Sequence, residues 1–159
     1  MLTTAPEVTI RQANEGDLEA IVDMVAAITK ETEDRLQDKD RLSRSTTQLI
    51  DTPGKGFCLV ADAGGHVVGI VVVTYLWSFY RNGTTWWIEA VYVHADWRRQ
   101  GVYSLLYDQV LQAAQSSTDA IGIGLRVDPD NHVAKAAYSR LGMAESPSRY
   151  ETYYISFTQ

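Results

Sequence analysis

A short basic turn between two apolar segments is the part of this sequence best suited to bind a ligand. It contains Arg98 and Arg99, followed by Gly101. The aromatic and β-branched run Trp86–Val93 before it favours a strand. After it, apolar residues recur at helical spacing, namely Val102, Leu105, Leu106, Val110, Ala113 and Ala114. Such a junction presents backbone N–H groups at the positive end of the helix, so we expect it to hold phosphate.

Two further features carry polar chemistry. Glu89 lies within the apolar strand, where burial of a carboxylate is costly unless it is paired or faces a wet cleft. Downstream, residues 127–143 contain Asn131, Tyr138 and Gly142. A tyrosine hydroxyl has a pKa of about 10 and can donate a proton while remaining neutral at pH 7.

These segments resemble the GNAT family of acyltransferases. Arg98-x-x-Gly101-x-Tyr103 is similar to the family's coenzyme A signature, R/Q-x-x-G-x-G/A, with Tyr103 in place of the last small residue. Residues 127–143 are similar to its later motif, V-x-x-x-N-x-x-A-x-x-x-Y-x-x-x-G-F/M, at every fixed position. Thr9–Ala13, followed by Asp17 and Leu18, looks like its first strand and helix entry. The resemblance spans nearly the whole chain and is strongest from Trp86 to Met143.

The resemblance implies roles for individual residues. Tyr138 would be the general acid that protonates the leaving thiolate, and Glu89 would take the proton of the amine, directly or through water. The main chain at Val91 and Val93 would pair with the pantetheine arm, and a backbone N–H there would polarise the thioester. Asn131 would contact the coenzyme or tie its loop. The pyrophosphate would be held at Arg99, Gln100, Gly101, Val102, Tyr103 and Ser104, and Arg98 would also belong to the cofactor-binding residues.

Each catalytic assignment has a structural alternative. Tyr138 could be a half-buried helix residue that packs on the sheet, and Glu89 could form a salt bridge with Arg81 or Arg126. We favour the functional interpretation of Tyr138 because Asn131 and Gly142 are in place, and that of Glu89 because several members of the resembled family have a glutamate at this position.

The predicted function is an N-acetyltransferase that transfers an acetyl group from acetyl-CoA to a primary amine in a ternary complex. The strand Trp86–Val93 is locally similar to that of polyamine and thialysine acetyltransferases, so the expected acceptor is a small amine. An amino acid, an antibiotic or a protein amine remains open as acceptor. The alternative from another class is a non-catalytic acyl-CoA-binding or sensor module, which would need neither Glu89 nor Tyr138.

Composition restricts the class of protein further. A chain of 159 residues suits a single domain over residues 1–159. The formal charge of −6 argues against a nucleic-acid partner and mildly favours a cationic substrate. The single cysteine, Cys58, is expected to be a small buried hydrophobe. No apolar run is long enough to span a membrane, and no secretory signal is visible at Met1–Thr9, so we expect a cytoplasmic protein without membrane contact.

The histidines offer no rival site. His66, His94 and His132 are isolated in the sequence and lack metal-ligand spacing, so no metal is expected. The sequence also lacks a phosphate-binding G-x-x-x-x-G-K-S/T loop and a G-x-S-x-G elbow.

The element order predicts an α/β fold in which helices cover both faces of a mixed sheet. Asn14 is expected to cap the first helix with Asp17 as its partner, and Ser45 is a candidate cap within a second helical region. Strands are expected at Val8–Arg11, Phe57–Ala61, His66–Tyr75, Trp86–Val93, Ile121–Val127 and Tyr150–Phe157. The resemblance implies a three-layer sandwich with a splayed, largely antiparallel sheet of six to seven strands. An aromatic group that could form a homodimer surface comprises Trp77, Phe79, Tyr80, Trp86 and Trp87.

Overall fold

The computed structural model describes residues 7–146 and 150–157. These described residues fall into two compact units, which divide between Arg126 and Val127. Residues 1–6, which begin the segment searched for a secretory signal, lie outside the described residues. Within the described ranges, no helix has both the length and the apolar character needed to cross a membrane.

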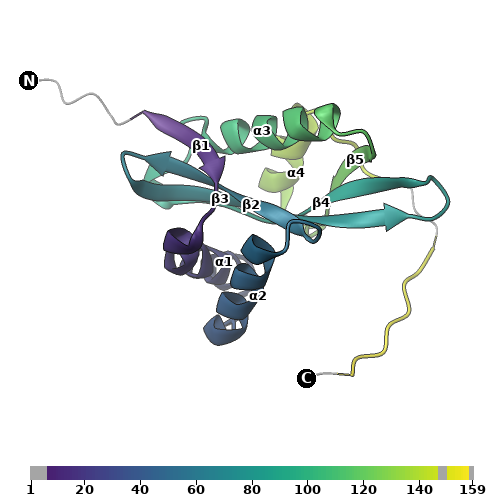
Figure 1. The fold of residues 1–159 in the computed structure, drawn as a ribbon, viewed down its shortest axis with the longest axis horizontal. Coiled ribbons are helices and arrows are strands. Elements are labelled where there is room, and N and C mark those ends of the chain that lie inside the picture. Colours follow the sequence, from purple (N-terminus) through teal and green to yellow (C-terminus); the bar gives the residue numbers. More distant parts are fainter. Residues whose placement is uncertain (1–6, 147–149, 158–159) are drawn as a thin grey trace, which may run out of the picture. The chain divides into compact units, whose positions relative to one another are not determined.

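The first unit is built on a five-stranded sheet with the strand order β1-β2-β3-β4-β5. The first four strands pair antiparallel, whereas β4 and β5 are parallel. Helices α1 and α2 lie on one side of the sheet and α3 lies on the other, as Figure 1 shows. The predicted α/β class with a mixed, largely antiparallel sheet is therefore confirmed. The strands are β1 (Val8–Gln12), β2 (Gly56–Ala63), β3 (His66–Ser78), β4 (Gly83–Val93) and β5 (Ala120–Leu125), and the helices are α1 (Leu18–Glu33), α2 (Lys39–Asp51) and α3 (Val102–Ser116).

The two faces of the sheet have separate apolar contacts. On the side of α1, Ile21 and Met24 pack against Cys58, Val60 and Ile70. Burial raises the pKa of the Cys58 thiol to about 12, as expected for a cysteine that acts as a hydrophobe.

On the side of α3, the helix approaches β3 at a glycine. A Cβ atom on Gly69 would lie 3.3 Å from side-chain atoms of both Val102 and Leu106. These two helix residues are almost fully buried. The absence of a side chain at Gly69 thus allows the first turns of α3 to pack closely on the sheet.

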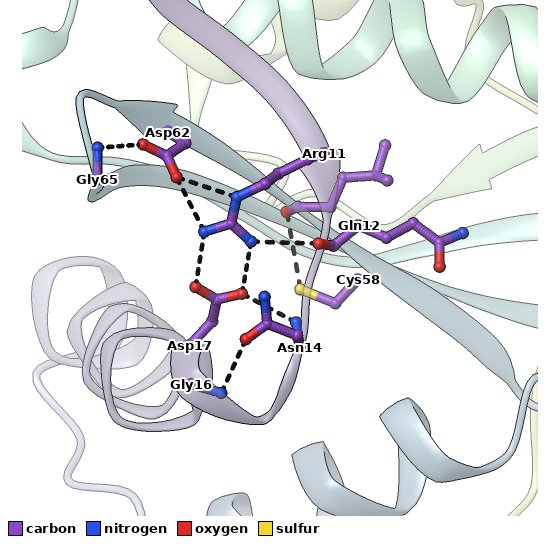
Figure 2. A network of polar contacts seen from close by, with 9 residues as sticks. Arg11, Gln12, Asn14, Gly16, Asp17, Cys58, Asp62 and Gly65 are labelled. Atoms are coloured by element: carbon purple, nitrogen blue, oxygen red, sulfur yellow. Dashed lines mark hydrogen bonds and ion pairs between the residues drawn. The ribbon is translucent and has the colours of Figure 1, made fainter.

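An arginine on β1 joins the first strand to the start of α1 (Figure 2). Its guanidinium group binds both carboxylate oxygens of Asp17, at 2.7 and 2.9 Å, and lies 2.9 Å from Asp62 on β2. Asp17 also accepts from the backbone N–H of Asn14, whose side chain accepts from Gly16 and so completes the predicted capping box. Arg11 therefore fixes the direction in which the chain leaves the sheet. The capping box belongs to a short 3-10 helix, η1 (Glu15–Asp17), which leads directly into α1.

The cap predicted for the second helical region is wrong. Helix α2 begins after Asp38, whose side chain accepts a hydrogen bond from the backbone N–H of Arg41, and Ser45 lies in the middle of the helix. Both residue types favour N-caps, but Asp38 precedes the first turn and its carboxylate also interacts well with the positive end of the helix.

Two predictions about strands and surface also need correction. Residues 150–157 form no strand, so the described part of the chain has five strands instead of six to seven. Strand propensity reflects packing on a half-buried pleated surface, and the large side chains of this segment are exposed. Trp86 does not contribute to a surface group, because it is buried and packs edge-on against Phe57. The aromatic residues exposed at the β3–β4 turn are Trp77, Phe79 and Tyr80.

The Arg11 network predicts an acid-dependent contribution to stability. Hydrogen bonds from Arg11 lower the pKa of Asp17 more than partial burial raises it. A carboxyl group whose pKa is lowered by folding stabilises the protein above its unfolded pKa of about 4 and loses this contribution as the pH falls through the folded value. We expect Arg11→Met to lower the free energy of unfolding by about 2 kcal/mol at pH 7, a value reduced for solvent screening, and by less at pH 3.

Denaturant unfolding at the two pH values measures this difference. Lys39→Met is the matched control, because it removes an ion pair with Asp23 whose two side chains are both more than half exposed. Its effect should stay within about 0.5 kcal/mol. An equal loss in both variants would contradict the structural role of Arg11.

Candidate functional site

The predicted phosphate turn lies at the end of β4, as expected. The chain passes through a short 3-10 helix, η2 (Ala95–Trp97), and enters α3 directly after Gly101. Arg99 and Gly101 have φ values of +58° and +82°, so two of the three residues before the helix are left-handed. In the part of the chain that the structure describes, no side chain caps α3 at Gly101, and the first turn of the helix contains no acidic residue. Its N–H groups and the helix dipole are therefore available to an anion.

The space above the turn suits a close approach by a ligand. A Cβ atom built on Gly101 would have no neighbour within 4 Å, so the main chain is open on this side. Arg99, Gln100 and Ser104 are exposed, whereas Val102 is buried against the sheet. The Gln100 side chain donates to the carbonyl of Asp96 at 2.7 Å and thereby closes the turn on itself.

Arg98 is engaged in the protein. Its Nε atom donates to the carbonyl oxygen of Val93 at 2.9 Å, and its Nη2 atom lies 2.8 Å from Glu31 at the end of α1. The same guanidinium group lies over the ring of Tyr92, which donates its hydroxyl to the other oxygen of Glu31 at 2.8 Å. Arg98 thus braces the turn against β4 and α1.

This brace was not anticipated from the sequence, because Glu31 is 67 residues away from Arg98. Partial burial would raise the pKa of Glu31, but the bonds from Tyr92 and Arg98 outweigh it and lower the pKa. The hydrogen bond to Glu31 raises the pKa of Arg98. Glu31 and Arg98 are therefore both ionised at neutral pH, and charge-assisted hydrogen bonds hold their geometry.

Strand β4 has a free edge where the pantetheine arm is expected. Its pairing with β5 runs only from Thr84 to Ile88, and the last pair is Ile88 with Leu125. Within the described residues, the edge of β4 beyond Ile88 has no strand partner on the β5 side, whereas Val91 and Val93 remain paired with β3 on the other. Main-chain groups on such an edge can pair with an extended ligand, and of those at Val91 and Val93 the Val93 carbonyl already accepts from Arg98.

Glu89 marks the point at which this edge becomes free. Val72 of β3 pairs with Ala90 and Val73 pairs with Ile88, so Glu89 is an extra residue in β4. Such a bulge bends a strand and re-aims its side chains. Glu89 is exposed and accepts a hydrogen bond from the Thr74 hydroxyl at 2.7 Å. The sequence suggested that burial of this carboxylate would be costly, but Glu89 is not buried. Within the described chain its partner is Thr74 instead of Arg81 or Arg126.

The other predicted residues lie in the second unit. Helix α4 (His132–Arg140) begins after Asn131, whose side chain accepts from the backbone N–H of Ala134 at 3.1 Å. Tyr138 lies on this helix and is half-buried, and Gly142 follows the helix with a φ of +84°. The cap explains why asparagine suits position 131 without any ligand. The joint use of Glu89 and Tyr138 remains a prediction.

Metal ligands do not gather in the described residues. No group of three or more histidine, cysteine, aspartate or glutamate side chains in residues 7–146 and 150–157 could hold a metal ion. The first unit carries main-chain donors at the turn and the exposed carboxylate of Glu89, and the second unit carries Tyr138 on α4.

No curated protein sequence gives a significant match. The crystal structure of a possible acetyltransferase from Clostridium difficile 630 is 32% identical, with a TM-score of 0.86, and the alignment covers 94% of this chain and 98% of that one. A protein described as a transcriptional regulator from Bacillus halodurans C-125 is 27% identical, with a TM-score of 0.77, and 93% and 100% of the two chains are covered.

A more distant structure shows the same fold. An aminoglycoside N-acetyltransferase in complex with CoA is 17% identical, with a TM-score of 0.78, over 99% of this chain and 100% of that one. The model of the acetyltransferase (GNAT) family matches residues 19–143. This match confirms the predicted enzyme class, an acetyl-CoA-dependent N-acetyltransferase. The chain belongs to the GNAT family of acetyltransferases.

Proposed function

We propose that this protein transfers an acetyl group from acetyl-CoA directly to a small primary amine within a ternary complex. The observation that carries the proposal is the uncapped start of α3, which follows a turn with two left-handed residues and open space above Gly101. An arrangement of this kind suits a pyrophosphate, because main-chain N–H groups and the helix dipole act together on the same anion.

The donor would bind along β4 and the turn. Backbone groups of Arg99, Gly101 and the first turn of α3 would hold the pyrophosphate, while Arg98 acts by bracing the turn. The free edge of β4 at Val91 and Val93 would pair with the pantetheine arm, and Asn131 would contact the coenzyme or keep its own loop in place. Tyr103 is half-buried, and because the contacts are made by main chain, a side chain at this position is compatible with binding.

The acceptor would bind beside Glu89. The nitrogen of the amine forms a bond with the thioester carbonyl carbon, and the carbon–sulfur bond breaks. Glu89 takes the proton that the amine loses, directly or through a water molecule, and the Tyr138 hydroxyl gives a proton to the departing thiolate. A main-chain N–H of β4 stabilises the charge that develops on the carbonyl oxygen. The exposure of Glu89 supports this role, because a base must be accessible to the acceptor.

The proposal treats residues 1–159 as one catalytic domain, since it uses Glu89 from the first unit and Tyr138 from the second. Trp77, Phe79 and Tyr80 are exposed, with neighbouring rings in edge-on contact, which supports their use in a homodimer. The cytoplasmic location and the absence of nucleic-acid and membrane partners stay predictions. A protein amine as acceptor and a non-catalytic acyl-CoA sensor are the alternatives. An amine screen that measures the release of free thiol from acetyl-CoA separates the enzyme from the sensor.

The donor site is tested at Gly101. Gly101→Trp should lower acetyl-CoA affinity by at least about 100-fold, because a bulky side chain prevents two or more charge-assisted contacts between main chain and phosphate. Calorimetric titration measures the affinity. Gly65→Trp is the control, since Gly65 is also left-handed, at φ +90°, and a Cβ there also has no neighbour within 4 Å. Unchanged binding in a folded Gly101→Trp protein would refute the site.

The general acid is tested with Tyr138→Phe. Loss of the hydroxyl should lower kcat by roughly 10²-fold to 10⁴-fold, the usual range for acid–base catalysis, with a smaller effect on acetyl-CoA binding. Steady-state kinetics provides the comparison, and Tyr80→Phe, at a side chain that is 95% exposed on the β3–β4 turn, is the control. Equal rates in Tyr138→Phe and the unmodified protein would leave Tyr138 as a packing residue.

The base is tested with Glu89→Gln, which keeps an oxygen for the Thr74 hydroxyl but removes the charge. The rate should fall most at the lower end of the pH range, where more of the amine is protonated and needs a base. The measurement is the pH dependence of the rate with an amine found in the screen. Glu15→Gln, at an exposed residue near the start of α1, serves as the control. Superimposable profiles for Glu89→Gln and the unmodified protein would exclude Glu89 as base or electrostatic anchor.

A further inference from the structure

An indole ring covers the junction between β4 and β5. Trp87 pairs with Gly124 across the parallel ladder. A Cβ atom on Gly124 would lie only 2.5 Å from the Trp87 ring, so the ring rests directly on the backbone of β5. The guanidinium group of Arg126, two residues further along the chain, lies over the same ring at 5.0 Å from its centre. Stacking on an aromatic ring fixes the plane of a guanidinium group and leaves its N–H edges free to bind.

Opposite charges face each other across the end of the ladder. The last β4–β5 pair is Ile88 with Leu125, so Glu89 and Arg126 are the next residue on each side. Thr74 pairs with Trp87 and its hydroxyl binds Glu89, while the guanidinium group of Arg126 lies over the Trp87 ring, so both charged residues are on the face that carries Trp87. Both are exposed. Glu89 is bound by the Thr74 hydroxyl and Arg126 by the indole ring, and in the described residues the two do not approach within 4.0 Å as an ion pair.

We propose that the acceptor of this enzyme carries a carboxylate as well as its amine, and that Arg126 binds this carboxylate. The inference rests on the proposed function, in which Glu89 faces the acceptor amine. The last pair of the ladder, Ile88 with Leu125, lies on neighbouring strands about 4.8 Å apart, and Glu89 and Arg126 follow it directly, so one small molecule can reach both side chains. An arginine suits the carboxylate because its planar fork forms two parallel hydrogen bonds with the two oxygens.

The charge of Arg126 also disfavours other amines. A polyamine that placed one ammonium group at Glu89 would bring its remaining positive charge near Arg126, which is repulsive. An amino acid or a similar amine with a carboxylate satisfies both side chains. The proposed acceptors are therefore amines that also carry a carboxylate, and not all small cationic amines.

Matched pairs of amines that differ only in the carboxylate test this inference. We compare L-lysine with cadaverine, L-ornithine with putrescine, and L-phenylalanine with phenethylamine, each with acetyl-CoA, and measure thiol release. Better use of the carboxylated member, by about 10-fold to 100-fold in kcat/KM, is expected for at least one pair. In Arg126→Gln this preference should disappear through loss of activity on the carboxylated amine, with the affinity for acetyl-CoA unchanged.

The control is Arg81→Gln, which removes the same charge from an exposed residue at the β3–β4 turn and should keep the preference. Arg126→Lys should retain part of it, because a lysine supplies charge without the planar fork. Two results would overturn the inference while leaving the proposed function intact: acetylation of the decarboxylated amines at least as well by the unmodified protein, or a loss of acetyl-CoA affinity in Arg126→Gln. Release of no thiol with any amine would instead overturn the proposed function, and the inference with it.

Discussion

One extra residue in β4 sets the arrangement on which the site depends. Glu89 is inserted between two residues that keep their antiparallel partners on β3, so the strand stays anchored on that side. On the other side, the parallel ladder with β5 ends at the preceding residue. Because a bulge increases local twist and bends the strand, it is a physical reason for β4 and β5 to separate here. The free edge of β4 and the exposed carboxylate of Glu89 then occur at the same point of the sheet.

Helix α1 is attached to the sheet at both of its ends by arginine–carboxylate pairs. At the start, Asp17 is bound by Arg11 of β1, and at the end, Glu31 is bound by Arg98 of the turn after β4. In the pair of Arg11 with Asp17, the Asp17 side chain is only 7% exposed to solvent. In the pair of Arg98 with Glu31, both side chains are 44% exposed. Solvent screens the pair of Arg98 with Glu31 more strongly, so this pair is the weaker of the two. The position of the phosphate turn relative to α1 can therefore change more easily than that of β1.

The parts of the fold that could be predicted from the sequence are those specified by local contacts. The capping box of Asn14 and Asp17 uses residues three positions apart. The phosphate turn was also predictable, because a glycine directly before a helix lets the main chain adopt the left-handed conformation that opens the N–H groups to a ligand. Asp38 was missed as a cap because several capping residues occur in this charged region, and the sequence does not indicate which of them lies directly before the helix.

The features that could not be predicted from the sequence depend on contacts between distant segments. The bulge at Glu89 is visible only in the pairing of β3 with β4, and without it the strand pattern indicates a buried residue at this position. The partner of Arg98 lies 67 residues earlier, and no local pattern indicates it. Residues 150–157 have the composition of a strand, but they form none, because composition alone does not determine strand pairing.

The burial of Cys58 has a practical consequence for work with this protein. The chain contains no other cysteine, and this thiol is 4% exposed with its pKa raised to about 12. The thiolate is the reactive form, so Cys58 in the folded protein should react only very slowly with disulfide reagents and alkylating agents. Coloured thiol reagents can therefore follow the release of coenzyme A without a background from the enzyme. Unfolding exposes the sulfur atom, so the same reagents would also count the unfolded molecules in a sample.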